Sequence, residues 1–141
     1  PTLSDPGYKL VREAIKECIK VEAIPGPSAI LNALVVSGLP TDKFLFLGFL
    51  PKKEGKRKNI LQSLPKKTTI IFFESPFRLL KTLKELKELF GDIEIVICRE
   101  LTKIFEEIRR EKISDSIRHL EQTKPKGEFT LLFHLHTSDV G

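Results

Sequence analysis

Charged residues follow two apolar runs of the sequence at the points where buried β-strands would end. The runs are Thr68–Phe73 and Ile93–Cys98. The charged groups after them are Glu74-Ser75-Pro76 with Arg78, and Arg99-Glu100 with Lys103. Ligand sites in open α/β sheets gather beyond the carboxyl ends of strands, and each apolar run fixes where the next side chains point. Ion pairs that close a helix entry or a loop are the structural alternative. A functional site is favoured because a third strand end carries a related feature.

The third strand end is a tight turn, Pro25-Gly26-Pro27, which follows the β-rich run Val21–Ile24. A helix is expected to begin at Ser28, because serine is a good N-cap, and Ala29 lets another group come close to the backbone. Amides at the start of a helix suit a negatively charged or carboxylate-bearing ligand. On this stretch alone a well-capped connection without a ligand is the favoured interpretation, since short turn motifs often match by chance.

Hydrophobic periodicity predicts an α/β chain around these groups. Helices are expected at 6–19, 28–36, 77–90 and 114–122, and a short basic helix is expected to end at Leu64-Pro65. Strands are expected at 44–49, 68–73, 93–98, 106–112 and 129–136. In this interpretation Ser75 and Ser114 cap the helices that follow them, Pro76 is the first residue of its helix, and 106–112 is an edge strand. The order of these elements predicts one mixed sheet of about five strands, mostly covered by helices.

Five basic residues gather in a glycine-bearing loop and in the start of the helix after it. They are Lys52, Lys53, Lys56, Arg57 and Lys58. Positive charge at a helix N-terminus opposes the helix dipole, which makes a role facing phosphate groups attractive. A solvated charged face is an equal alternative. The net charge of +5 over 141 residues also leans toward an anionic partner.

Two pairs of side chains have simpler structural explanations than functional ones. Phe44 and Phe46 share one face of a strand and are expected in the core rather than in a base-stacking platform, because the positions between them are also apolar. His134 and His136 lie on one face of the last strand, a spacing compatible with a metal. The sequence places no third ligand beside them, so an edge or surface pair is expected and no metal site is predicted.

The cysteines and the apolar content indicate a cytoplasmic protein. Cys18 and Cys98 both fall on apolar faces, as buried thiols do in a reducing compartment. No apolar run approaches the roughly 20 residues of a membrane-spanning helix. The chain begins at Pro1 without a start methionine or a leader, so we expect it to be an internal piece of a longer protein. Gly-x-Gly-x-x-Gly, Walker and nucleophile motifs are missing.

Six short motifs, taken in order, resemble one family. They are Pro1 with Leu3-Ser4-Asp5-Pro6-Gly7, Pro25-Gly26-Pro27-Ser28-Ala29, Gly48-Phe49-Leu50-Pro51, Glu74-Ser75-Pro76 with Arg78-Leu79, Arg99-Glu100-Leu101-Thr102-Lys103, and Gly127-Glu128. Together they resemble the tetrapyrrole methylase superfamily. Within it they resemble the bacterial enzymes that methylate the ribose 2′-hydroxyl of a cytidine in 16S rRNA. The proline-glycine-serine-alanine and glycine-glutamate motifs are shared by the whole superfamily, whereas the Glu74 and Arg99 stretches point to the rRNA branch.

The resemblance implies S-adenosylmethionine as the cofactor, bound in a cleft between two domains. Residues 1–40 would be the end of an N-terminal cofactor-binding α/β domain, Gly38–Thr41 a linker, and 41–141 the C-terminal α/β domain. One wall of the cleft would come from Pro1, Leu3, Ser4, Pro25, Gly26, Pro27, Ser28 and Ala29, and the other from Phe73 and the final strand. With much of the first wall missing, this chain alone is expected to bind the cofactor poorly and not to turn over.

The resemblance also implies roles for the charged residues. Glu74 or Glu100 would accept or relay the proton of the 2′-hydroxyl, and Lys103 joins them in the catalytic set. Arg78, Arg99 and Lys103 would hold neighbouring phosphates, and the five-residue basic cluster would attract 16S rRNA in the small ribosomal subunit. No metal is required, and a homodimer is expected. Two alternatives stay open: a superfamily enzyme that acts on a tetrapyrrole precursor or a modified histidine, and a non-catalytic module for RNA binding or dimerisation.

Overall fold

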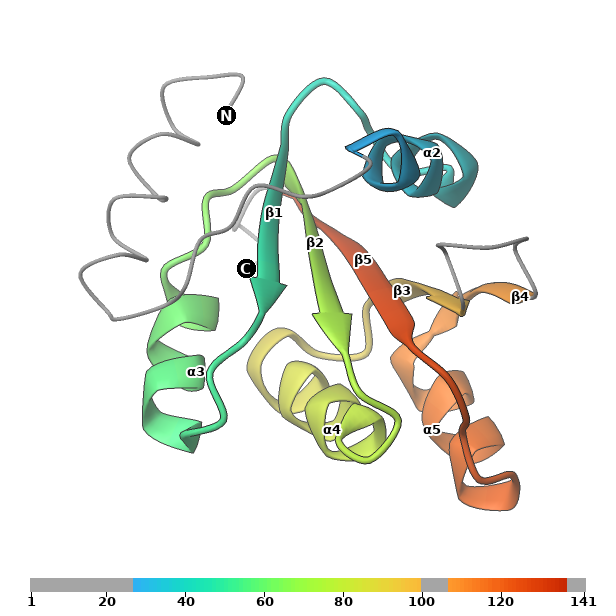
Figure 1. The fold of residues 1–141 in the computed structure, drawn as a ribbon. Coiled ribbons are helices and arrows are strands. Elements are labelled where there is room, and N and C mark those ends of the chain that lie inside the picture. Colours follow the sequence, from blue (N-terminus) through green and yellow to red (C-terminus); the bar gives the residue numbers. More distant parts are fainter. Residues whose placement is uncertain (1–26, 100–106, 137–141) are drawn as a thin grey trace.

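A computed structural model describes residues 27–99 and 107–136, with side chains from residue 30 onward. The elements in order are α2 (Pro27–Ser37), β1 (Phe44–Phe49), α3 (Glu54–Gln62), β2 (Thr68–Glu74), α4 (Leu79–Phe90), β3 (Glu94–Arg99), β4 (Glu107–Lys112), α5 (Ile113–Gln122) and β5 (Phe129–Leu135). Figure 1 shows the five strands as one layer, with α2 on one face and α3, α4 and α5 on the other. The expected helix 6–19 and strand 21–24 lie outside the described residues.

The sheet has the strand order β1-β2-β5-β3-β4. β1 and β2 are parallel, whereas the β2–β5, β5–β3 and β3–β4 pairs are antiparallel. The predicted mixed five-stranded sheet is therefore confirmed, as is the edge position of the strand that ends at Lys112. Since β1, β2 and β3 run in the same direction, their carboxyl ends share one edge of the sheet with the amino ends of β5 and β4. We call this the carboxyl edge.

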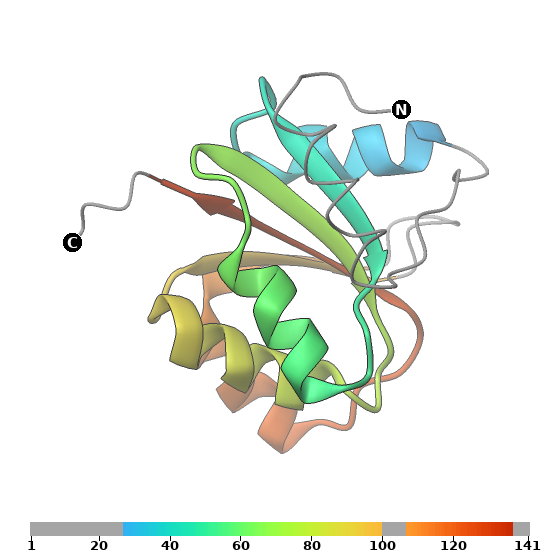
Figure 2. The ribbon, with the colours of Figure 1, turned by 90° about the vertical axis from the view of Figure 1, so that its left-hand side faces the viewer.

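Both faces of the sheet are buried, which explains why its central strands are apolar throughout rather than alternating. The larger cluster packs strand residues such as Phe72 and Phe133 against α3, α4 and α5. The smaller cluster packs α2, through Ile30, Ala33 and Leu34, against the other face. In Figure 2 the sheet lies between α2 above and the three other helices below. α2 thus packs on the C-terminal sheet, and the domain boundary near residue 40 stays a prediction.

The helix after β2 begins later than the sequence predicts. Residues 76–78 form a turn, and α4 starts at Leu79, so Ser75 is not its N-cap and Pro76 is not its first residue. The reason is that the backbone N–H of Ser75 donates to the carboxylate of Glu74, and the turn closes with a bond from the N–H of Arg78 to the carbonyl of Ser75. The predicted end of this helix is confirmed: Gly91 follows it with φ +87°, a conformation that favours glycine.

Two other predicted caps lie inside their helices. α2 begins at Pro27, so Ser28 is its second residue, although the helix ends as predicted, before Gly38 with φ +78°. α5 begins at Ile113, and the N–H of Ser114 donates to Asp92, 22 positions earlier, at 2.8 Å. The hydroxyl of Ser114 donates to the other oxygen of Asp92 at 2.7 Å. A carboxylate from another segment, and not the side chain of Ser114, therefore supplies the cap.

Asp92 makes the stability of the domain depend on pH. The hydroxyl and the backbone N–H of Ser114 hold the pKa of Asp92 below its ordinary value of 3.8. A lowered pKa in the folded state adds stability above the ordinary pKa, and that stability is lost as the pH falls through the lower folded value. Asp92→Asn and Ser114→Ala are therefore expected to reduce the difference in melting temperature between about pH 7 and about pH 3. Wild-type pH dependence in both variants would contradict this assignment.

None of the described helices is long and apolar enough to cross a membrane.

Candidate functional site at the carboxyl edge

The carboxyl edge brings together two of the charged groups that the sequence singles out. Glu74 at the end of β2 pairs with Phe129 at the start of β5, and Phe129 also pairs with Arg99 at the end of β3. Arg99 in turn pairs with Glu107 at the start of β4. Residues that are paired on neighbouring strands point to the same face of a sheet, and both Glu74 and Arg99 are paired with Phe129. Glu74 and Arg99 therefore share the face covered by α4 and α5. The structure thus brings the Glu74 and Arg99 groups to one edge of the sheet, whereas the predicted strand 21–24 of the third group lies outside the described residues.

The carboxylate of Glu74 is buried, with 5% of the residue exposed. One oxygen accepts the N–H of Ser75 at 2.8 Å, and the other accepts the hydroxyl of Thr82 at 2.6 Å. The Nε atom of Arg78 lies 3.8 Å from the first oxygen. The helix-entry ion pair that was the structural alternative for Glu74 and Arg78 is thus present. It fixes a negatively charged group and a partly exposed cation at the carboxyl edge.

Arg99 belongs to a chain of ion pairs that sequence reasoning missed. Its Nε atom lies 3.6 Å from Glu107, which lies 3.4 Å from the Nε atom of Arg109. Arg109 contacts Glu111 at 3.7 Å, and Glu111 also accepts the hydroxyl of Ser116 at 2.7 Å. The only signal in the sequence is the alternation of charge at 107, 109 and 111, which places three charged side chains on one face of a strand.

These charged residues line a cavity of about 450 Å³ between β3, β4 and α5. Its basic lining residues are Arg99, Arg109, His119, Lys124 and Lys126, and its acidic ones are Glu107 and Glu111. Glu107 is paired with Arg99 and Arg109, and Glu111 with Arg109, His119 and the hydroxyl of Ser116. Both acids thus have partners, and two further lysines add positive charge to the lining. Such a lining suits a polar, negatively charged group.

Arg57 must be removed from the predicted RNA-contacting cluster. Its side chain is only 1% exposed. The Nε and Nη2 atoms donate to the carboxylate of Glu85 at 2.7 and 2.5 Å, and Nη1 donates to the carbonyls of Pro51 and Lys52 at 3.0 and 2.8 Å. The hydrogen bond to Glu85 raises the pKa of the guanidinium above its ordinary value. The spacing to the buried Ile60 and Leu61 could have shown that Arg57 faces inward.

The four lysines of the cluster differ from Arg57. Lys52, Lys53 and Lys58 are exposed and Lys56 is half-buried. Their role in RNA binding stays a prediction.

Phe73, predicted to line the cofactor cleft, lies on the face opposite to Glu74. Its ring contacts the rings of Phe46 and Phe49 at centroid distances of 5.0 and 5.4 Å. Phe44 and Phe46 pack against the smaller core cluster, as predicted. Phe49 is 59% exposed, so an accessible aromatic surface remains at the carboxyl edge on the α2 side of the sheet.

Seven predicted site residues lie outside the described part of the chain. They are Pro1, Leu3, Ser4, Pro25, Gly26, Glu100 and Lys103. Pro27, Ser28 and Ala29 form the first turn of α2. Their roles stay predictions.

The histidines and the described cysteine show no metal-binding arrangement. The Nδ1 atoms of His134 and His136 lie 3.2 Å apart. Within residues 27–99 and 107–136, no three His, Cys, Asp or Glu side chains are grouped as metal ligands. Burial raises the pKa of the Cys98 thiol to about 11, which keeps this thiol protonated and unreactive at neutral pH.

Comparison with known proteins adds family information to this geometry. The family model described as Tetrapyrrole (Corrin/Porphyrin) Methylases matches residues 1–116. Ribosomal RNA small subunit methyltransferase I of Thermotoga maritima is 50% identical over 133 residues, which are 94% of this chain and 60% of that protein. The proteins of the same name from Halalkalibacterium halodurans and Rickettsia prowazekii are each 46% identical over 94% of this chain, covering 46% and 48% of their lengths. The chain therefore spans about half the length of the curated relatives it matches.

Proposed function

The chain belongs to the tetrapyrrole methylase family, and from this membership we propose that the whole protein transfers a methyl group from S-adenosylmethionine to RNA. The substrate that we propose is the ribose 2′-hydroxyl of a cytidine in 16S rRNA. The observation that carries the proposal is the identity of 46–50% to three proteins named as small-subunit rRNA methyltransferases, across 94% of this chain. The carboxyl edge, where a buried carboxylate lies beside cations, supports it chemically.

The aromatic surface on the α2 face supports the proposed cofactor. Phe73, with the rings of Phe46 and Phe49 beside it, offers an apolar platform for a flat base such as adenine. We propose that Phe73 and the first turn of α2 (Pro27, Ser28 and Ala29) hold the cofactor together with Pro1, Leu3, Ser4, Pro25 and Gly26. When bound, S-adenosylmethionine supplies an electrophilic methyl group on a sulfonium. The protein then has to align the hydroxyl and take up its proton.

We assign the proton transfer to Glu74 or Glu100, with Lys103 in the same catalytic set. Glu74 is held at the edge by Ser75 and Thr82, which fix its orientation. Arg78, Arg99 and Lys103 would hold the phosphates next to the target nucleotide, because guanidinium groups and ammonium groups bind phosphate oxygens strongly. Lys52, Lys53, Lys56 and Lys58 would add a salt-sensitive attraction to rRNA. The small ribosomal subunit as partner, a cytoplasmic location and a homodimer remain part of the proposal.

The decisive experiment is methyl transfer by this chain extended to the length of its relatives, which we call the extended protein. It would be given labelled S-adenosylmethionine and small ribosomal subunits from a strain that lacks the modification, with already modified subunits as the control. We expect label on a cytidine ribose after digestion. Label on a base, or on no RNA at all, would contradict the proposed substrate and point to a small molecule or a protein.

A further inference from the structure

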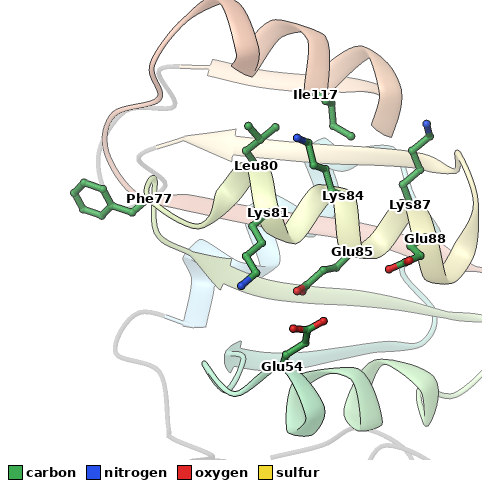
Figure 3. A pocket seen from close by; sticks show the side chains of 9 residues that line it. All are labelled: Glu54, Phe77, Leu80, Lys81, Lys84, Glu85, Lys87, Glu88 and Ile117. Atoms are coloured by element: carbon green, nitrogen blue, oxygen red, sulfur yellow. The ribbon is translucent and has the colours of Figure 1, made fainter.

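Phe77 is the most exposed of the large apolar side chains in the described residues, at 89%. It lies in the turn of residues 76–78, between the buried Glu74 and the start of α4, at the carboxyl edge. In Figure 3 its ring points away from the protein at one end of α4. An aromatic ring gains little from a position in water, so its exposure beside the proposed site suggests a partner for it.

A groove with a volume of about 1000 Å³ runs from Phe77 along the outer face of α4. Leu80 and Ile117 give it apolar walls, and Lys81, Lys84 and Lys87 follow one another along the helix (Figure 3). The acidic residues of the lining are Glu54, Glu85 and Glu88. Glu85 already forms an ion pair with Arg57. Lys84 forms an ion pair with Glu121, and both of these side chains are more than half exposed. Such a surface pair contributes little and yields easily to another anion.

The lining of the groove contains three lysines and three glutamates, of which Glu85 is paired with Arg57, and the groove lies in a segment of the chain that is rich in positive charge. Residues 51–90 contain eleven lysines and arginines against four glutamates, a net charge of +7, whereas the whole chain carries +5. The two arginines of the segment are paired with Glu85 and Glu74. The surplus of the segment is therefore carried by lysines, three of which (Lys81, Lys84 and Lys87) line the groove, and this suits electrostatic attraction to a polyanion.

We propose that this face binds a single-stranded stretch of RNA, with an unpaired base stacked on Phe77 and phosphates near Lys81 and Lys84. The inference rests on the proposed function and extends it to the part of the substrate next to the modified nucleotide. A single protruding ring can stack on a base only where that base is not stacked in a helix. One ring beside lysines that point to both sides of α4 (Figure 3) fits alternating bases and phosphates better than it fits an apolar protein surface.

The chain contains no tryptophan, so Phe77→Trp provides a fluorescent probe at this position alone. We expect its emission to be quenched when the chain is titrated at low salt with a single-stranded RNA of about 10 nucleotides. The matched control is Val35→Trp on α2, an exposed apolar position (71%) on the other face of the sheet, where no quenching is expected. Equal quenching at both positions would overturn the proposal, as would failure of the chain to bind single-stranded RNA.

Alanine variants test the energetic contribution of the surface. We expect Phe77→Ala to weaken binding of the same RNA by about 5- to 150-fold, the range for losing one stacked base. Lys81→Ala should reduce the slope of log affinity against log salt by about 0.7. Lys66→Ala, at the opposite edge of the sheet, should leave that slope unchanged. Unchanged affinity in Phe77→Ala, equal affinity for duplex RNA, or binding to anionic lipid vesicles in place of RNA would each contradict the proposal.

The binding measurements need no cofactor, which separates this inference from the proposed function. Suppose that RNA quenches the emission of the Phe77→Trp variant and Phe77→Ala weakens RNA binding, but the extended protein transfers no methyl group. The RNA-binding surface would then be supported and the proposed reaction contradicted. Conversely, the extended protein could methylate rRNA equally well with and without Phe77→Ala, while RNA causes no quenching. The reaction would then be supported and the RNA-binding surface contradicted.

Discussion

Replacing Arg57 by alanine is expected to lower the free energy of unfolding by about 3–5 kcal/mol, the usual loss when one partner of a buried ion pair is removed. The guanidinium is almost fully buried and supplies the hydrogen bonds that hold the carboxylate of Glu85 and the carbonyls of Pro51 and Lys52. Its removal leaves a partly buried charge without its cation and two carbonyl groups without this donor. The loop before α3 and the middle of α4 would lose their connection.

Urea denaturation at neutral pH measures this effect. The control is Lys58→Ala, an exposed neighbour on the same helix, which should change the free energy of unfolding by no more than about 0.5 kcal/mol. The loss of unfolding free energy in Arg57→Lys should lie between those of Arg57→Ala and Lys58→Ala, because an ammonium group cannot make the same set of hydrogen bonds as a guanidinium group. The double variant Arg57→Ala, Glu85→Ala should lose less unfolding free energy than the sum of the losses in the two single variants. A loss below about 1 kcal/mol in Arg57→Ala would show that the pair is not a structural anchor.

The positions of the strands along the chain and the mixed sheet could be predicted from sequence because the strand signals are local, whereas the order β1-β2-β5-β3-β4 was not predicted. β2 and β5 are apolar runs between polar turns, and Gly38 and Gly91 mark helix ends where φ is positive. The starts of α4 and α5 could not be predicted in the same way. They depend on the carboxylates of Glu74 and Asp92, whose partners are fixed by the fold: Thr82 is eight positions away from Glu74, and Ser114 is 22 away from Asp92.

The residues of the candidate site likewise divide into those that the sequence places and those that depend on contacts within the fold. The positions of Glu74 and Arg99 follow from the rule that parallel strands end at one edge, and the sequence suffices for that. The role of Arg57 does not follow, because its partner Glu85 lies 28 positions later on another helix. The cavity beside Arg99 requires the pairing of β3 with β4, which brings Glu107 into reach. Contacts between segments far apart in the sequence, from helix to helix and from strand to strand, therefore decided which predicted cations remain available to a substrate.

We expect that replacing the glutamate that accepts the proton by glutamine lowers kcat of the extended protein by about 10²–10⁴-fold, the usual contribution of general base catalysis. Glu74→Gln and Glu100→Gln are the two variants to compare. At Glu74 the glutamine can preserve the structure. Its carbonyl can accept the N–H of Ser75, and its amide can donate to Thr82, because a hydroxyl is both donor and acceptor. A fall in kcat with an unchanged KM for RNA would then report the loss of the negative charge.

Thr82→Val separates proton transfer from positioning at Glu74. Valine has the shape of threonine but removes the hydroxyl that holds one oxygen of the carboxylate, so the charge stays and its orientation is loosened. If Glu74 accepts the proton, Thr82→Val should cost much less than Glu74→Gln, because a carboxylate in the wrong orientation still reaches the hydroxyl part of the time. Equal losses would make Glu74 a positioning residue for Arg78 and the turn of residues 76–78. Changes below about tenfold in both glutamine variants would remove both carboxylates from the reaction, because a group that takes the proton in the transition state cannot be neutralised without a larger loss.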